Sequence, residues 1–284
     1  MPNNLISPQE LQDQLNSDTP PKILDIRWRL DKPEGREDYE AGHIPGAVYV
    51  SLDEELSDTA KQGLGRHPLP SPETVDELLQ RLGVGNSDEV VVYDDWNRSG
   101  SARAWWVLTA SGMEDVRILD GGYSAWVAAG GEVETTTPED SLLDRPVDVP
   151  DLYLSALRPV LDANQAANIA RAGVLLDARD PARYAGEDNP EGEKPGHIPG
   201  AASLAGVSLL DDDGFFRPAE QLSEIFDRAG ATPDTRAGAY CGSGVTACVV
   251  IAAAYSIDRD IALFPGSWSQ WSADPAAPVE TGRG

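Results

Sequence analysis

The sequence predicts an α/β protein made of two tandem domains, each a mainly parallel sheet flanked by helices. The first reason is a repeat, because residues 42–47 read GHIPGA and residues 196–201 repeat these letters without change. Three further segments recur in the same order, which indicates two homologous domains. The matching pairs are residues 24–27 with 176–179, 92–94 with 239–241, and 119–126 with 264–271. The second reason is that short apolar runs alternate with helical patterns in both halves, as in a parallel sheet covered by helices.

In the first half, a short apolar strand at residues 23–24 ends in an Asp-x-Arg motif. Ser71 and Pro72 predict the start of a helix, because serine caps free backbone N–H groups and proline suits the first turn. Gly83 predicts the end of that helix. The run VVVY at residues 90–93 is apolar and β-branched, as a fully buried parallel strand should be.

The second half shows the same order of elements. An apolar strand at residues 174–176 again leads into Asp-x-Arg, and residues 217–230 contain the next predicted helix. A strand ending at Tyr240 is followed by a run at residues 247–254 that reads as a buried helix. Ligands of such sheets bind at the carboxyl ends of the strands, which directs attention to the turn after Tyr240.

The domain boundaries follow from composition. Residues 1–135 are assigned to the first domain and residues 159–284 to the second. The segment between them, residues 136–158, is rich in Thr, Pro, Asp and Glu and lacks hydrophobic periodicity. We predict that it is a linker lying on the surface.

Composition narrows the class of function. The 284 residues are 40% hydrophobic and 25% charged, as in a soluble globular protein. A net charge of −26 argues against nucleic acid or an anionic membrane as a partner, and an anionic substrate would need a local basic pocket. No signal-peptide pattern or membrane-spanning run is present, so we expect a cytoplasmic protein. Two cysteines cannot form a disulfide framework.

Cys241 is predicted to lie at a turn between a strand and a helix. Free backbone N–H groups and the positive end of a helix dipole gather there, and both favour thiolate over thiol. Gly242 and Gly244 let the backbone curl closely around whatever the sulfur carries. One alternative is that Cys241 is a structural cysteine beside a Gly-Ser turn, without a chemical role. A phosphatase of the Cys-x5-Arg type is another alternative, but Ala247 stands where its phosphoryl-binding arginine is needed.

Residues 241–247, CGSGVTA, resemble the active-site loop of the rhodanese family, in the form typical of 3-mercaptopyruvate sulfurtransferases. The paired GHIPGA segments, PGSW at residues 265–268 and PVETG at residues 278–282 are similar to other signature segments of that family. The resemblance covers nearly the whole chain and implies a non-catalytic first domain and a catalytic second one. The repeat agrees, because Asp94 stands where Cys241 stands in the second half, and a carboxylate cannot carry sulfur.

The resemblance implies that Cys241 is the nucleophile and takes up the donor's sulfur as a persulfide. This covalent persulfide is the expected intermediate, and neither a metal nor another cofactor is expected. The residues expected to line the outer sulfur, chiefly through backbone N–H groups, are Gly242, Ser243, Gly244, Val245 and Thr246.

Asp53 and His67 match an Asp and a His of the family that face the cysteine loop and form a proton relay with a loop serine, here Ser243. Such a relay meets a chemical need, because pyruvate leaves the donor as an enolate and a proton must be handled. His43 and His197 belong to the repeated segments, and the copy without a cysteine keeps its histidine. We therefore expect both to be structural, and the aspartates of the two Asp-x-Arg motifs likewise.

Two cations are expected to bind the donor. Arg183 matches the family's substrate-binding arginine, whose planar guanidinium can hold a carboxylate through two hydrogen bonds. Many relatives carry a second arginine nearby, and in residues 186–194 of this chain only Lys194 is available for that role. Cys248 lies about two turns into the following helix and is predicted to be a core residue rather than a second redox thiol.

Together these features predict a sulfurtransferase that moves sulfur from 3-mercaptopyruvate, a small anionic donor, to cyanide or a thiol acceptor such as thioredoxin or a small thiol. The active site is expected at the domain interface. Transfer from thiosulfate is the alternative within the family. Relatives of that type carry bulky basic residues after the cysteine, whereas Gly242 and Ser243 are small and neutral. A persulfide-carrying module with little turnover is the alternative from another class.

Overall fold

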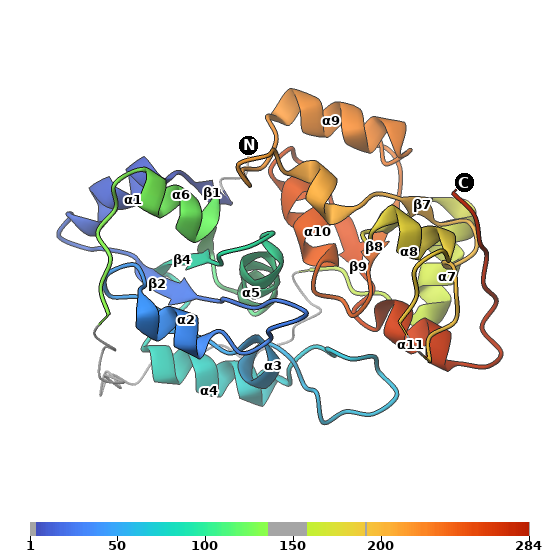
Figure 1. Cartoon of the computed structure of the whole chain (residues 1–284), viewed down its shortest axis with the longest axis horizontal. Helices are drawn as coiled ribbons and strands as arrows, with labels where there is room; N and C mark the ends of the chain where they lie inside the picture. Colours follow the sequence, from blue (N-terminus) through green and yellow to red (C-terminus); the bar gives the residue numbers. More distant parts are fainter. Residues whose placement is uncertain (1–3, 136–157, 191, 284) are drawn as a thin grey trace.

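The computed structural model describes residues 4–135, 158–190 and 192–283, which form two halves of similar architecture (Figure 1). The first half is coloured blue to green in Figure 1, and the second half yellow to red. The predicted linker, residues 136–158, lies outside the described residues except for Arg158. None of the helices in these ranges is both long and apolar enough to cross a lipid bilayer.

The first half contains a five-stranded sheet in the order β1-β5-β4-β2-β3, and each pair of neighbouring strands is parallel. Its strands are β1 (Leu5–Ile6), β2 (Lys22–Asp25), β3 (Val48–Tyr49), β4 (Glu89–Tyr93) and β5 (Asp115–Leu119). The strands β2, β4 and β5 are buried along most of their length, because helices cover both faces of the sheet. The buried strand predicted at residues 90–93 is confirmed.

Helices of this half connect and cover the strands. They are α1 (Pro8–Leu15), α2 (Arg36–Ala41), α3 (Leu52–Glu55), α4 (Pro72–Leu82), α5 (Ser99–Ala110) and α6 (Gly122–Ala128). The Oγ atom of Ser71 accepts a hydrogen bond from the Thr74 backbone N–H at 3.2 Å, so this serine caps α4. Gly83 ends α4 in the left-handed conformation. Both predicted boundaries of this helix are confirmed.

The second half contains a four-stranded parallel sheet in the order β7-β6-β8-β9. Its strands are β6 (Val174–Asp177), β7 (Ala202–Ser203), β8 (Ala237–Tyr240) and β9 (Ile261–Leu263). Its helices are α7 (Ala163–Ala172), α8 (Pro181–Ala185), the 3-10 helix η1 (Gly206–Leu209), α9 (Ala219–Arg228), α10 (Ala247–Tyr255) and α11 (Ser267–Ala273). The predicted buried helix is α10, whose side chains are buried from residue 247 to residue 254.

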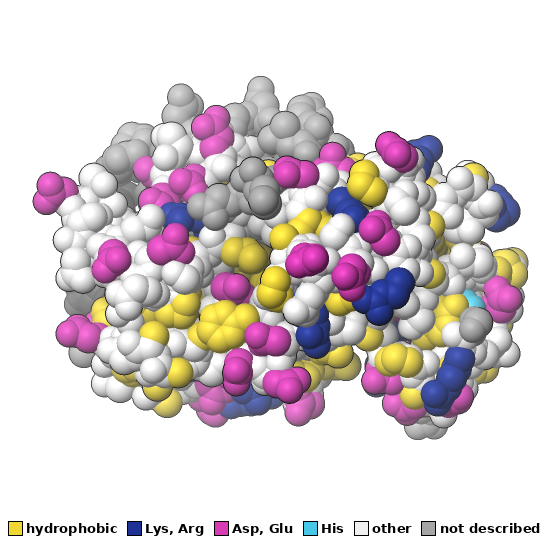
Figure 2. Space-filling view, turned by 90° about the horizontal axis from the view of Figure 1, so that it is seen from above, with side chains coloured by type: hydrophobic (Ala, Val, Ile, Leu, Met, Phe, Trp, Pro, Cys, Tyr) yellow, Lys and Arg dark blue, Asp and Glu magenta, His cyan; other side chains and the backbone are white. Residues whose placement is uncertain are grey.

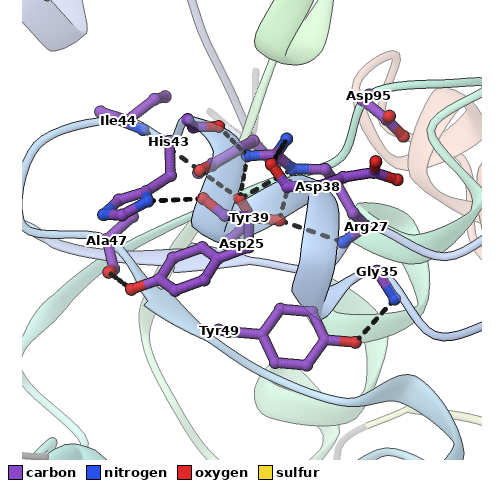
Figure 3. A network of polar contacts seen from close by, with 12 residues as sticks. Asp25, Arg27, Gly35, Asp38, Tyr39, His43, Ile44, Ala47, Tyr49 and Asp95 are labelled. Atoms are coloured by element: carbon purple, nitrogen blue, oxygen red, sulfur yellow. Dashed lines mark hydrogen bonds and ion pairs between the residues drawn. The ribbon is translucent and has the colours of Figure 1, made fainter. Parts of the chain in front are cut away.

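A polar network fixes the first GHIPGA segment (Figure 3). The Asp25 carboxylate accepts a hydrogen bond from the Arg27 guanidinium at 2.7 Å, and the same guanidinium donates to the Gly42 carbonyl at 2.6 Å. His43 is buried, and its Nδ1 atom lies 2.7 Å from the Tyr39 carbonyl oxygen. These side chains therefore hold the loop between α2 and β3 against the end of β2.

The second half repeats this network residue by residue. The Arg179 guanidinium donates to Asp177 at 2.6 Å and to the Gly196 carbonyl at 2.7 Å. The Nδ1 atom of His197 lies 2.8 Å from the Tyr184 carbonyl oxygen. The structural roles predicted for both histidines and both aspartates are confirmed by these contacts.

The two halves share a hydrophobic core. α5 of the first half packs against α10 of the second at the centre of the molecule (Figure 1), and their side chains belong to one continuous apolar cluster. Polar contacts join the halves at the edge of this core. The Phe216 backbone N–H donates to the Asp120 carboxylate at 2.8 Å, and the Asn4 side chain donates to the Ala252 carbonyl at 2.9 Å. The turn between β8 and α10 therefore lies where the two halves meet.

The Asp120 contact makes the stability of the protein depend on pH. Burial raises the pKa of Asp120 to about 6, although the Phe216 N–H and the positive charge of Arg98 partly oppose this shift. Because the folded protein binds this proton more tightly than the unfolded chain does, the carboxyl contributes stability that is complete below a pH of about 4 and is lost as the pH rises to about 6.

We expect Asp120→Asn to remove this dependence, because an amide keeps an acceptor for the Phe216 N–H but does not titrate. Urea unfolding between pH 4 and pH 7 should show the free energy of unfolding of the wild type falling by roughly 2–3 kcal/mol relative to the variant. If the free energy of unfolding changed with pH in the same way for both proteins, Asp120 would not titrate in this range.

Candidate active site

Cys241 follows β8 directly and lies at the carboxyl end of its sheet, as the sequence predicts. Its side chain is 2% exposed, and its Sγ atom accepts the Gly244 backbone N–H at 3.1 Å. The Cys241 backbone N–H donates to the Ser267 Oγ atom at 3.1 Å. Gly244 has a φ of +84°, and a side chain there would overlap the Pro265 carbonyl oxygen, so only glycine fits. The loop thus directs a backbone N–H at the sulfur.

The first turn of α11 holds the cysteine loop from the other side. The Trp268 backbone N–H donates to the Cys241 carbonyl, and the Ser269 backbone N–H donates to the Gly242 carbonyl, both at 2.9 Å. Because the loop carbonyls are bound to α11, the loop is fixed in the curve that brings the Gly244 N–H to the sulfur.

The remaining predicted residues of the loop are enclosed by protein. Ser243 and Val245 are buried. Thr246 lies at the start of α10, and its Oγ1 atom is 3.2 Å from the Ser99 Oγ atom at the start of α5. The first half therefore touches the loop that carries Cys241.

His67 and Asp53 come from the first half and form a pair. The His67 Nε2 atom lies 3.2 Å from the Asp53 Oδ1 atom, and the Trp28 indole N–H donates to the same oxygen at 3.1 Å. His67 is 8% exposed, and its ring stands edge-on to the Trp28 ring with 5.4 Å between centroids. These contacts hold the imidazole in one orientation.

The structure thus brings together two members of the predicted relay and places Ser243 in the cysteine loop. In the described ranges, no hydrogen bond joins Ser243 to His67. The His67 Nδ1 atom is buried and has no hydrogen-bond partner. This nitrogen therefore has an unused hydrogen-bonding position inside the protein.

Arg103, on α5, connects the relay segment to the cysteine loop, and sequence analysis missed it. Its side chain is fully buried. The guanidinium donates to the carbonyls of Leu56, His67 and Pro68 at 3.1 Å and to the Gly244 carbonyl at 3.3 Å. No carboxylate in the described part of the chain pairs with it. One buried cation therefore fixes His67 and Gly244 relative to each other across the interface.

Cys248 lies beneath the same loop as a core residue. It is fully buried, and its thiol donates to the Gly244 carbonyl at 3.5 Å. Burial raises the pKa of Cys248 to about 12, although the charge of Arg103 partly opposes this. Cys248 therefore stays a neutral thiol at physiological pH, as expected for a core cysteine.

The two cations predicted to bind the donor have different partners in the structure. The Lys194 ammonium donates to the carbonyls of Asp274, Pro275 and Ala277, at 2.6, 3.3 and 2.9 Å. An ammonium has three N–H bonds, so these contacts occupy Lys194. The expectation that Lys194 binds the donor is therefore corrected, because this side chain fastens the segment after α11. Arg183 is half-buried in α8, and its Nε atom lies 3.9 Å from the Asp188 carboxylate.

A second arginine that sequence analysis missed stands over the cysteine loop. A Cβ atom added at Gly242 would lie 3.1 Å from the Arg66 Nη2 atom. The Arg66 guanidinium forms an ion pair with Glu193 of the second half. On the face shown in Figure 2, acidic side chains are spread over both halves and basic ones are fewer. A cation beside the cysteine loop is therefore notable in a chain of net charge −26.

The corresponding turn of the first half, between β4 and α5, is filled by an aspartate and an arginine side chain. Asp94 is buried and accepts hydrogen bonds from the backbone N–H and the hydroxyl of Ser101, at 3.0 and 2.8 Å. The Arg98 guanidinium lies 3.1 Å from the Asp94 carboxylate. A side chain at Gly122 would overlap this guanidinium. Arginine thus occupies the space inside this turn, and no nucleophile is present.

Comparison with known proteins shows the family of this chain. The family model described as Rhodanese-like domain matches the chain twice, at residues 7–129 and 161–274. SseB of Mycobacterium tuberculosis, which carries the name of a thiosulfate sulfurtransferase, is 49% identical over 99% of this chain and 97% of its own. A Pseudomonas aeruginosa protein that carries the name of a 3-mercaptopyruvate sulfurtransferase is 40% identical over 98% of both chains.

Solved structures give the same result. SseA of Escherichia coli, a 3-mercaptopyruvate sulfurtransferase, superposes with a TM-score of 0.80 and 29% identity, over 94% of this chain and 100% of that one. The 3-mercaptopyruvate sulfurtransferase of Leishmania major gives a TM-score of 0.83, also at 29% identity, over 98% of this chain and 76% of that one. The chain therefore belongs to the rhodanese family and is a sulfurtransferase with two rhodanese-like domains.

Proposed function

We propose that this enzyme transfers sulfur from 3-mercaptopyruvate to a thiol or to cyanide through a persulfide on Cys241. The observation that carries the proposal is the Gly244 N–H at 3.1 Å from the Cys241 sulfur, in a loop that Arg103 ties to the His67 segment. A backbone N–H aimed at the sulfur suits a sulfur that carries negative charge during transfer, and the segment of His67 is tied to the same loop through Arg103.

In the first half-reaction, the Cys241 thiolate attacks the donor's sulfur. An S–S bond forms, the donor's C–S bond breaks, and its electron pair stays on carbon as the enolate of pyruvate. The proton of the donor's thiol must leave the sulfur, and a proton must reach the enolate carbon. His67, with an unpaired Nδ1 atom and Asp53 on its Nε2 atom, is proposed to carry this proton together with Ser243. In the second half-reaction, the acceptor attacks the outer sulfur, and the Cys241 thiolate leaves.

His67→Ala is expected to lower kcat with 3-mercaptopyruvate by about 100-fold or more and kcat with thiosulfate by less than about threefold. The reason is that thiosulfate releases sulfite, which takes the electron pair and needs no proton on carbon. The measurement is steady-state thiocyanate formation with each donor. Asp53→Asn, which keeps an acceptor for Trp28, should give a smaller loss in the same direction. Equal losses with both donors would remove His67 from proton transfer.

Thiosulfate is the second candidate donor, because the relative from Mycobacterium tuberculosis carries the name of a thiosulfate sulfurtransferase. Against it, Gly242 and Ser243 are small and neutral, and the positive charge beside them comes from Arg66 of the other half. The deciding measurement is kcat/KM for each donor with cyanide as the common acceptor. A large preference for 3-mercaptopyruvate supports the proposal, and a preference for thiosulfate reverses the choice of donor. Failure with both donors would indicate a persulfide-carrying module.

A thiol such as thioredoxin or a small thiol is the proposed physiological acceptor, in the cytoplasm. Both cysteines are free, which agrees with a reducing compartment. The test is to replace cyanide by reduced thioredoxin or glutathione and to measure pyruvate release. A rate that neither thiol raises above the rate without an acceptor would exclude this choice.

A further inference from the structure

Arg66 places a positive charge beside the nucleophile from the opposite half of the molecule. Its Nη2 atom lies 3.1 Å from the point where a side chain on Gly242 would begin. Gly242 follows Cys241 directly, and consecutive Cα atoms are about 3.8 Å apart. The guanidinium is therefore within reach of a small molecule whose sulfur is being attacked by Cys241. Its side chain is 39% exposed, so a solute can reach it.

The loop that carries Arg66 is fixed against the second half. The Arg66 backbone N–H donates to the Ser269 Oγ atom at 3.0 Å, and the Gln270 side chain donates to the Gly63 carbonyl at 3.1 Å. Gly65 has a φ of +95°, and any side chain there would overlap the Gly266 carbonyl. Figure 1 shows this loop, which follows α3, extending from the first half towards the second. The backbone of Arg66 is thus held in place and only its side chain is free to change partner.

That side chain already binds a carboxylate, since Glu193 of the second half forms an ion pair with it. The planar guanidinium matches a carboxylate and can bind it through two hydrogen bonds. Two other cations of the chain differ from Arg66, because backbone carbonyls occupy them. Arg103 donates to four carbonyls, and Lys194 donates to three.

We propose that Arg66 binds the carboxylate of the sulfur donor by exchanging Glu193 for it, and thereby selects donors that carry a carboxylate near the sulfur. The inference rests on the proposed function for the identity of the donor. The contact itself can be tested without turnover, because Arg66 should bind any small carboxylate that approaches the Cys241 sulfur.

The first experiment compares alkylation of Cys241 by iodoacetate and by iodoacetamide, which differ only in carboxylate against amide. It uses Cys248→Ser protein, so that only Cys241 reacts, after cyanide has removed bound sulfur. Arg66→Gln should lower the ratio of the iodoacetate rate to the iodoacetamide rate about tenfold. Iodoacetamide serves as the internal reference for any change in the thiolate itself.

Arg29→Gln is the matched control. Arg29 is 41% exposed, lies in the same half and pairs with Asp95 at 2.6 Å, so the variant removes the same charge from a similar ion pair. The ratio should be unchanged in this control. An unchanged ratio in Arg66→Gln would overturn the proposal, because Arg66 would then have no effect on the carboxylate. An equal fall in both variants would also overturn it, because the effect would then come from the net charge of the protein and not from a contact with Arg66.

The second experiment measures donor kinetics. Arg66→Gln should raise KM for 3-mercaptopyruvate about 10- to 100-fold with kcat changed less than about threefold, and Glu193→Gln should lower KM because the exchange no longer opposes binding. An unchanged or higher KM in Glu193→Gln would overturn the exchange. If the wild type fails to turn over 3-mercaptopyruvate while the alkylation preference persists, the proposed donor is wrong and the carboxylate contact stands. Turnover with an unchanged KM in Arg66→Gln would refute the role of Arg66 alone.

Discussion

Cys241→Ser is expected to abolish sulfur transfer, with a loss of at least about 10⁴-fold in kcat. A serine hydroxyl is a far weaker acid and a weaker nucleophile than a thiol, so the Gly244 N–H would face an oxygen that does not attack the donor. An oxygen atom also cannot hold the transferred sulfur in a persulfide that an acceptor can strip off. The measurement is thiocyanate formation with each donor, together with intact-protein mass spectrometry after exposure to the donor. The wild type should gain the mass of one sulfur atom, and the variant should gain none.

Cys248→Ser is the matched control, because Cys248 is the other of the two cysteines and lies beneath the same loop. A hydroxyl can still donate to the Gly244 carbonyl, so this variant should keep most of its activity and should gain sulfur on exposure to the donor. Retained transfer in Cys241→Ser would refute the persulfide mechanism. Loss of transfer in Cys248→Ser, with a normal fold, would give Cys248 a role that its burial does not explain.

Arg103→Leu is expected to have the largest effect among substitutions outside the cysteine loop. The change leaves the buried carbonyls of Leu56 and His67 without their donor. The carbonyls of Pro68 and Gly244 lose one donor and keep the Asp58 N–H and the Cys248 thiol. An unsatisfied buried polar group costs about 1–3 kcal/mol, and removal of the buried cation relieves part of that cost, so we expect a net loss of about 3–5 kcal/mol. Urea unfolding followed by tryptophan fluorescence measures this loss. The activity per folded molecule should fall as well, because His67 and Gly244 lose their shared anchor.

Arg259→Leu is the control that distinguishes a loss of stability from a displacement of the active-site residues. Arg259 is also buried, but its guanidinium donates to the Ala231 carbonyl and to Ser223, both within the second half. This variant should lose stability and keep its activity below the unfolding transition. Arg103→Lys should recover part of the stability, because an ammonium reaches some of the carbonyls. Full activity in folded Arg103→Leu would show that the arginine does not position the site.

The fold could be predicted from the sequence because the repeat marks equivalent elements twice. The Asp-x-Arg motifs and the GHIPGA segments form the same contacts in both halves, so the copy without a cysteine identifies residues that serve the fold. Short strands such as Val48–Tyr49 and Ala202–Ser203 were not predicted, since two residues carry no periodicity.

The candidate site was predictable only where its residues lie in one recognisable segment. The cysteine loop is such a segment, and the resemblance also indicated His67 and Asp53. Arg103 was missed because it stands in an apolar helix, and sequence does not reveal that its guanidinium reaches carbonyls in both halves. Lys194 was assigned wrongly because its charge is visible in the sequence, whereas the carbonyls that occupy it lie some 80 residues away.

The shared core of the two halves also sets an order of events during synthesis on the ribosome. Asn4 donates to the Ala252 carbonyl across 248 residues of chain, and α5 is made long before its partner α10. Domains generally fold as they emerge, so the sheet of the half bearing His67 and Arg103 can form before Cys241 leaves the ribosome. That half then offers a finished surface against which the cysteine loop closes. A nascent chain therefore holds the segment of His67 and Asp53 before it holds Cys241, and the cysteine loop is the last of these parts to take its place.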